Sequence, residues 1–259
     1  MAHFYLSDSV TAAGLGDTVL LSGDEGRHAS VVARMRVGES TTIGDGAGRV
    51  ARAEATAVSK DAVQLRVVQV TEVAPPRPAV TLVQALAKGG RDELAVQAAT
   101  ELGVAAVAPW SAARSVTRWG GDRIARGEAR WASILREAGK QAMRPWLPQA
   151  LPLMDTAQIA ALAADRQVAD RPVRDHPVAD RLVVVLDPDA SRRLVDVVPT
   201  DLTADLVLVV GPEGGIAPEE LALLQAAGAV PARLGPTVLR TSTAAPAALA
   251  ALAVHLRLW

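Results

Sequence analysis

A glycine-rich stretch between two regular elements is the first candidate for chemistry. Gly211-Pro212-Glu213-Gly214-Gly215 follows directly on the apolar run Leu206–Val210 and precedes a segment with helical periodicity. Three glycines at the carboxyl end of a predicted strand indicate backbone in unusual φ/ψ regions, or backbone in close contact with a ligand. The stretch lacks the GxGxxG and GK[ST] patterns of dinucleotide and nucleoside-triphosphate loops. A ligand loop and a tight strand–helix turn both remain open from the residues alone.

A second candidate stretch runs from Leu234 to Ala244. It combines a Gly-Pro turn, an apolar pair, Arg240 and several hydroxyl side chains before the last predicted helix. Ser and Thr commonly cap helix N-termini, so capping accounts for the hydroxyls without a ligand. Arg240 is unusual because it precedes a segment with the composition of a buried helix. An ion pair with a carboxylate such as Glu213 would account for it.

A third stretch covers residues 130–148 and is rich in charge. At helical spacing one face would carry Arg130, Ile134, Glu137 and Gln141, and another Arg136, Lys140 and Arg144. Periodicity alone favours a solvated helix with ion pairs between successive turns.

Several catalytic chemistries have no support in this sequence. The chain has no cysteine, which excludes disulfides, thiolate metal sites and cysteine nucleophiles. Its four histidines are scattered and form no HExxH pattern, so a metal site is not expected. Aromatic residues make up only 3% of the chain, which argues against a single-strand reader built on stacking platforms.

Charge is distributed unevenly along the 259 residues. The whole chain has a formal net charge of −1, but residues 75–150 carry 11 Lys and Arg against 6 Asp and Glu. Clustered arginine is typical of surfaces that bind phosphate groups. An anionic partner and a solvated surface are both compatible with this pattern. Within it, Arg118 lies beside Trp119-Gly120-Gly121, where we expect a mobile loop.

The first 73 residues have the pattern of a small β-barrel. Strands are predicted at Thr18–Leu21, Ser40–Ile43, Arg49–Val58 and Ala62–Val70, with one helix over about Glu25–Met35. Ala74-Pro75-Pro76-Arg77-Pro78 follows, and its three prolines in four residues suit a linker rather than a helix or a central strand.

Residues 79–259 have the alternating pattern of an α/β domain with a mostly parallel sheet. Strands are predicted at Ala79–Ala85, Val104–Pro109, Leu182–Leu186 and Leu206–Val210, and helices at Arg91–Leu102, Arg123–Met143, Pro218–Ala227 and Thr243–Leu258. In the first helix, Leu94, Ala98 and Leu102 form the predicted apolar stripe. Ala164–Arg181, which contains His176, has the composition of a charged surface excursion. With no leader-like start and no long apolar run, we expect a cytoplasmic protein outside the membrane.

Taken together, these stretches resemble the RsmE-type ribosomal RNA uridine N3-methyltransferases of the SPOUT superfamily, across nearly the whole chain. The resemblance rests on His28 with Arg34-Met35-Arg36-Val37-Gly38-Glu39, Thr100-Glu101-Leu102-Gly103-Val104, Arg114-Ser115, the 130–148 stretch, the GPEGG stretch, and Leu234-Gly235 with Leu239-Arg240-Thr241 and Thr243-Ala244. Two positions depart from the family pattern: Ser242, where the family usually has Glu, and Ala98, where it usually has Lys.

The resemblance implies an N-terminal PUA-like β-barrel and a C-terminal parallel-sheet domain with a trefoil knot. It implies a homodimer that uses S-adenosylmethionine to methylate N3 of a uridine in 16S (small-subunit) ribosomal RNA. The implied cofactor-binding residues are Leu186, Asp187, Pro188, Gly211, Pro212, Glu213, Gly214, Gly215, Leu234, Gly235, Val238, Leu239, Arg240 and Thr241. At Gly214 and Gly235 a side chain is expected to collide with the cofactor or with the knotted backbone.

Loss of the N3 proton leaves an anion that a guanidinium would stabilise. The candidate catalytic residues are Arg240, Arg144, Arg114 and Glu213. The candidate RNA-binding residues are His28, Arg34, Arg36, Lys88, Arg114, Arg118, Gln141 and Arg144. Two other functions remain open: methylation at another RNA position, such as a ribose 2′-O, and RNA binding without catalysis.

Overall fold

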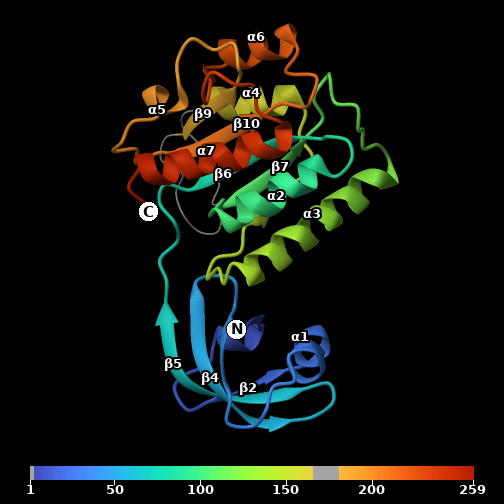
Figure 1. Cartoon of the computed structure of the whole chain (residues 1–259), viewed down its shortest axis with the longest axis vertical. Helices are drawn as coiled ribbons and strands as arrows, with labels where there is room; N and C mark the ends of the chain where they lie inside the picture. Colours follow the sequence, from blue (N-terminus) through green and yellow to red (C-terminus); the bar gives the residue numbers. More distant parts are fainter. Residues whose placement is uncertain (1–2, 166–180) are drawn as a thin grey trace. The chain divides into compact units, whose positions relative to one another are not determined.

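The computed structural model describes residues 3–165 and 181–259, so His176 and most of the charged excursion lie outside the described residues. The chain divides into two compact units (Figure 1). Unit 1 comprises Met1–Pro75 with Gly139–Leu147, and unit 2 comprises Pro76–Ala138 with Pro148–Trp259. The predicted linker at residues 74–78 lies at the boundary between Pro75 and Pro76. A division there does not assign segment 139–147 to unit 1, because that segment is remote in sequence from the rest of the unit.

Unit 1 is built on a five-stranded sheet with the order β1-β3-β4-β5-β2. The strands are β1 (Phe4–Leu6), β2 (Thr18–Leu21), β3 (Ser40–Gly44), β4 (Arg49–Val58) and β5 (Val63–Glu72). All pairings are antiparallel except that of β1 with β3. Val63, Leu65 and Val67 alternate with exposed residues and face the core, as a half-buried strand requires. The sequence analysis missed β1, whose three residues are too few for periodicity to reveal.

The helical segment of unit 1 is shorter than predicted and starts earlier. It consists of α1 (Gly23–Arg27) and a π-helical turn, η2 (His28–Val32). A further short helix, η1, covers Asp8–Val10. Arg34 has φ +54°, a left-handed conformation that α-helices do not contain, so the predicted extension to Met35 is wrong.

The segment 139–147 completes unit 1 by packing on the turn between β3 and β4. The Trp146 ring lies against Gly48, and its Nε1 donates to Val73 O at 2.8 Å. Leu147 covers Gly46, and Lys140 Nζ lies 2.8 Å from Glu25 Oε1. Both glycines have positive φ, so the close approach depends on the absence of a side chain at left-handed positions.

We predict that Gly48→Ala destabilises the protein more than Gly38→Ala. Both positions have left-handed backbone, with φ +101° and φ +89°, which costs a non-glycine residue about 1–2 kcal/mol. A Cβ at Gly48 would also lie 2.5 Å from the Trp146 ring, whereas at Gly38 it would meet nothing within 4 Å. Urea denaturation should therefore show a further loss of about 1–3 kcal/mol at Gly48. Equal losses would mean that the tryptophan moves aside freely.

Unit 2 contains a six-stranded sheet with the order β11-β9-β10-β6-β7-β8, in which every pairing is parallel. The strands are β6 (Val80–Ala85), β7 (Ala106–Trp110), β8 (Gln149–Ala150), β9 (Arg181–Leu186), β10 (Asp205–Val210) and β11 (Val230–Ala232). The predicted mostly parallel sheet is confirmed. All six carboxyl ends lie along one edge of the sheet, which gathers the loops that follow them.

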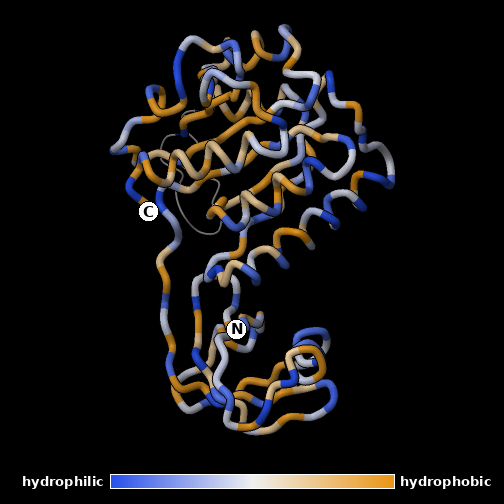
Figure 2. The backbone as a smooth tube through the Cα atoms, viewed as in Figure 1, coloured by the Kyte–Doolittle hydropathy of each residue, from blue (hydrophilic) through white to orange (hydrophobic). Residues whose placement is uncertain are grey.

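Helices cover both faces of this sheet (Figure 1). They are α2 (Arg91–Glu101), α3 (Asp122–Gln141), α4 (Thr156–Ala164), α5 (Leu194–Val197), α6 (Pro218–Ala226) and α7 (Thr241–His255). One core cluster joins the sheet to α2, α3, α5 and α7, and the other joins it to α4 and α6. Figure 2 shows the hydrophobic runs of the central strands between these layers. No helix in the described ranges has the length and hydropathy needed to cross a bilayer.

The predicted apolar stripe of α2 is wrong at Leu94, whereas Leu102 is partly buried and packs against the core. Asp92, Val96 and Ala99 face the interior, while Leu94 is 59% exposed. Helix α2 contains many small residues, so Leu94 dominates its hydrophobic pattern. The alanines, which do pack against α7, contribute little to that pattern. The boundaries of the other predicted helices and strands differ from the observed ones by up to three residues. Helices and strands lose their regular hydrogen bonding gradually at their ends, so these boundaries are the hardest to predict.

A buried carboxylate connects three elements behind the carboxyl edge of the sheet. Glu220, in the first turn of α6, is 9% exposed. Its Oε1 accepts from Ala113 N at 2.9 Å and from Thr156 Oγ1 at 2.7 Å, and its Oε2 accepts from Ala217 N at 3.4 Å. These contacts hold the loop after β7, the start of α4 and the start of α6 together.

We predict that Glu220→Ala lowers the free energy of unfolding by about 2–3 kcal/mol, because it leaves buried donors without an acceptor. Glu219→Ala is the matched control, since Glu219 lies in the same helical turn but is exposed. Thermal and urea denaturation should show a change below about 0.5 kcal/mol for the control. A loss for Glu220→Ala as small as that of the control would contradict the proposed junction.

Candidate functional site

A pocket of about 680 Å³ lies at the carboxyl edge of the unit 2 sheet. Three loops form most of its wall: residues 186–189 after β9, 211–216 after β10, and 233–241 after β11. Every residue that the resemblance assigned to the cofactor lines this pocket. Sequence-distant stretches therefore meet because their strands are neighbours in one parallel sheet.

The glycine-rich loop begins where β10 ends and is held against the loop that carries Arg114. Arg114 Nη1 donates to Gly214 O at 3.2 Å. A Cβ at Gly214 would lie 3.3 Å from Arg114 Cβ, a tight contact with a neighbouring loop, and the expected collision with the cofactor stays a prediction. Gly235 differs, because a Cβ there would meet no protein atom within 4 Å. At Gly235 the expected collision with the knotted backbone is therefore wrong, and the expected collision with the cofactor stays a prediction.

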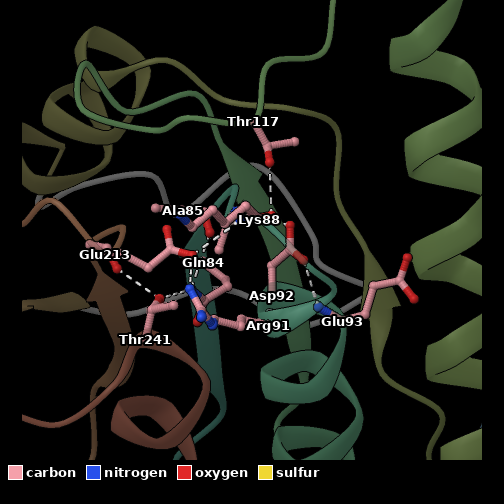
Figure 3. A network of polar contacts seen from close by, with 11 residues as sticks. Gln84, Ala85, Lys88, Arg91, Asp92, Glu93, Thr117, Glu213 and Thr241 are labelled. Carbon is pink, nitrogen blue, oxygen red and sulfur yellow. Dashed lines mark hydrogen bonds and ion pairs between the residues drawn. The ribbon is translucent and has the colours of Figure 1, made fainter.

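Glu213 pairs with Arg91 and not with Arg240, so the ion pair suggested by the sequence is wrong. Glu213 Oε1 accepts from Arg91 Nη1 at 2.9 Å and from Lys88 N at 3.2 Å (Figure 3). Desolvation raises the pKa of this carboxyl, but hydrogen bonds from its own backbone N–H, from Arg91 and from Lys88 outweigh it and leave the pKa below its ordinary value. A carboxylate in this state is a weak base.

Arg240 lies at the pocket with its guanidinium uncommitted. It is exposed, it precedes α7 as the N-cap residue, and its side chain makes no hydrogen bond or ion pair within the described residues. Arg114, by contrast, already donates to Gly214 O. Of these two sequence-predicted catalytic arginines, Arg240 is the one that can reorient toward a bound anion.

A buried polar chain lies behind the pocket wall. Gln84 Nε2 donates to Thr241 Oγ1 at 2.8 Å (Figure 3). Thr241 Oγ1 in turn donates to Gly211 O at 2.8 Å. The sequence analysis missed Gln84. Its signal is a single amide side chain in the otherwise apolar strand end Leu82–Ala85.

The loop after β9 is tied to the residues after β11. Asp187 N donates to Ala232 O at 3.0 Å, and Leu194 N donates to Arg233 O at 2.8 Å. The Arg233 guanidinium donates to Ala190 O at 2.6 Å. Arg91 and Arg233 both line the pocket, and the sequence analysis named neither as a site residue.

The loop after β7, for which mobility is expected beside Arg118, makes several contacts in this structure. Trp119 fills the space above Gly127 and meets Trp131 edge-on, with ring centroids 5.6 Å apart. Thr117 Oγ1 donates to Ala87 O at 2.9 Å, and Arg118 Nη2 donates to Ala113 O at 2.6 Å.

The predicted RNA-binding residues are divided between the two units. Unit 1 contains His28, Arg34, Arg36, Gln141 and Arg144, and unit 2 contains Lys88, Arg114 and Arg118. Of these, only Arg114 lines the pocket. Arg144 is half-buried in unit 1 and does not line the pocket. Its desolvation lowers the pKa of the guanidinium to about 10.

The pocket suits a small organic ligand with polar edges. Its volume lies within the range of cofactor sites, and its loops offer backbone amides and carbonyls, the Asp187 carboxylate and several guanidinium groups. No cluster of three or more potential metal ligands occurs among residues 3–165 and 181–259.

Comparison with known proteins agrees with this architecture. A family described as RNA methyltransferase domain matches residues 75–253, and one described as RNA methyltransferase PUA domain matches residues 21–68. The chain is 43% identical over 249 residues to Ribosomal RNA small subunit methyltransferase E of Mycobacterium tuberculosis, covering 96% of this chain and 91% of the relative. The protein of the same name from Bacillus subtilis is 31% identical over 247 residues, covering 93% and 91%.

Solved structures are similar over the whole chain. A methyltransferase from Legionella pneumophila in complex with S-adenosylmethionine is 30% identical, with a TM-score of 0.79 and coverage of 98% of this chain and 96% of that one. Ribosomal RNA small subunit methyltransferase E from Neisseria gonorrhoeae, bound to the same cofactor, is 26% identical, with a TM-score of 0.81 and coverage of 100% and 98%. By family match, by identity over nearly its full length and by fold, this chain belongs to the RNA methyltransferase family that includes Ribosomal RNA small subunit methyltransferase E.

Proposed function

We propose that this protein uses S-adenosylmethionine to methylate N3 of a uridine in small-subunit ribosomal RNA. The observation that carries the proposal is the pocket at the carboxyl edge of the parallel sheet, whose wall contains every residue that the family resemblance assigned to the cofactor. The relatives named for small-subunit ribosomal RNA support the substrate class, and the structural neighbours with bound S-adenosylmethionine support the cofactor.

The residues of the pocket fit S-adenosylmethionine without a metal ion. Backbone groups of residues 211–215 and 234–241 would hold its adenine and its polar edges, and Asp187 would accept from ribose hydroxyls or from the ammonium group. The open space at Gly235 leaves room for a ligand directly against the backbone. When bound, S-adenosylmethionine supplies an electrophilic methyl group on a sulfonium centre.

Electrostatic stabilisation is the main chemical task of the protein. Uridine N3 carries a proton at neutral pH, and it attacks only after that proton leaves. A guanidinium beside O2 or O4 favours the resulting anion. Arg240 takes this role because its side chain is uncommitted, and Arg114 supports the glycine-rich loop through Gly214 O. Glu213 holds Lys88 N and Arg91, and the proton passes to solvent because the lowered pKa makes Glu213 a poor base.

RNA contacts and assembly use surfaces outside the pocket. Arg34 and Arg36 of unit 1 are exposed, as are Lys88 and Arg118 of unit 2, and their charges suit phosphate groups. A homodimer would cover apolar side chains that α7 and the C-terminus leave exposed, namely Val254, Leu258 and Trp259. A ribosomal RNA substrate implies action in the compartment where ribosomes are assembled.

We predict that the purified protein binds S-adenosylmethionine in a calorimetric titration and converts one uridine of small-subunit ribosomal RNA to 3-methyluridine. Nucleoside mass spectrometry of the reacted RNA identifies the product. If the product is a 2′-O-methylated nucleoside, the cofactor assignment stands and the N3 assignment is overturned. Absence of cofactor binding would favour RNA binding without catalysis.

We predict that Arg240→Met lowers the single-turnover methylation rate about 100-fold or more, the scale of losing one stabilising donor. The loss should be larger than any change in S-adenosylmethionine affinity, and it should shrink as pH rises, because free uridine then loses its N3 proton without help. Arg257→Met is the control, since Arg257 is exposed and does not line the pocket. A normal rate for Arg240→Met together with a loss for Arg114→Met would transfer the role to Arg114.

A further inference from the structure

We propose that Gln84 is a positioning residue for the cofactor pocket, acting through Thr241 on the first carbonyl of the glycine-rich loop. This inference rests on the proposed function of the pocket. Gln84 does not line the pocket and is 0% exposed. Its action is therefore indirect, through the chain Gln84–Thr241–Gly211, of which Figure 3 labels Gln84 and Thr241.

The hydrogen bonds of this chain have only one consistent direction. Gly211 O can only accept, so the Thr241 hydroxyl donates its single hydrogen to it at 2.8 Å. The hydroxyl must then accept from Gln84, which places the amide nitrogen toward Thr241 at 2.8 Å. The same nitrogen lies 3.2 Å from Ala85 O, a second group that can only accept. The side chain at position 84 must therefore donate two hydrogen bonds from one atom while staying neutral. At this length, the glutamine amide is the side chain that does so.

Gln84 is unfavourable for folding at this place. It faces the α2 and α7 layer, where its neighbours Leu82, Leu86, Leu208 and Val210 are all apolar and buried. Its Oε1 is buried and has no hydrogen-bond partner within the described residues. An unsatisfied buried acceptor destabilises a protein, whereas an apolar side chain of similar size would not. A position that served packing alone would be occupied better by leucine or methionine.

The chain connects three elements that meet at the pocket. Gln84 lies at the carboxyl end of β6, Gly211 opens the glycine-rich loop, and Thr241 begins α7 directly after Arg240. Strand β6 pairs with β10 in the register Gln84 to Val210, so the relay starts beside the strand that the loop leaves. By holding Thr241, whose hydroxyl donates to Gly211 O, Gln84 sets the separation of the two loops between which the cofactor would lie.

The test compares Gln84→Met with Gln149→Met in the full-length protein. Methionine keeps the unbranched shape of glutamine and removes the amide. Gln149 is a matched control because it lies on β8 of the same sheet, also has a buried Oε1 without a partner in the described residues, and does not line the pocket. We expect Gln84→Met to weaken S-adenosylmethionine binding about tenfold, the scale of one lost buried hydrogen bond, without lowering the melting temperature. Gln149→Met should bind as the unsubstituted protein does.

Thr241→Val removes the hydroxyl from the same chain and serves as the second variant. If the relay acts as a unit, the double variant should lose no more affinity than the larger single loss. Additive losses would overturn the relay, and so would a lowered melting temperature of Gln84→Met with unchanged affinity. Failure of the unsubstituted protein to bind would overturn the proposed function itself. If the unsubstituted protein binds S-adenosylmethionine and Gln84→Met binds it with the same affinity, this inference alone is overturned.

Discussion

Parallel pairing of β9, β10 and β6 is the constraint on which the rest of the pocket depends. Because these strands run in one direction, the chain leaves each of them at the same edge, and the following loops must share the space beyond it. In β9 and β10 the side chains are mostly buried on both faces, which makes these two strands near-continuous runs of Val and Leu and leaves the site to the loops. The loops then hold one another: Asp187 N bonds to Ala232 O, and Thr241 Oγ1 to Gly211 O.

The core of unit 2 is built mainly from Ala, Val and Leu, so its few polar residues have few possible hydrogen-bond partners. Each buried polar group in unit 2 must find partners or destabilise the fold. Glu220 is satisfied by donors from three segments, and Asp92 accepts from Ala87 N and Glu93 N at the start of α2. Gln84 is satisfied on one side only. These residues lie where loops must be held in fixed positions, which links the polar content of the core to the architecture of the pocket.

The large aromatic residues fill positions that small side chains cannot. Trp146 joins residues 139–147 to the turn at Gly48, and Trp119 anchors the loop after β7 on Gly127. In both places a glycine provides the space and a single indole supplies the buried area. With aromatics at only 3% of the chain, these two contacts have few substitutes.

The sequence by itself determined the β-rich start, the α/β remainder and two of the special loops, at residues 211–215 and 234–244, while the full set of pocket residues came from the family resemblance. Those features are local: alternation and apolar runs report burial of a strand, and glycines and prolines report turns. Only the tertiary structure decided which charges meet. Glu213 pairs with Arg91, 122 residues away in sequence, and Gln84 reaches Thr241 across 157. Such pairings follow from strand order and helix placement, which depend on the packing of the whole unit, and no local pattern contains that information.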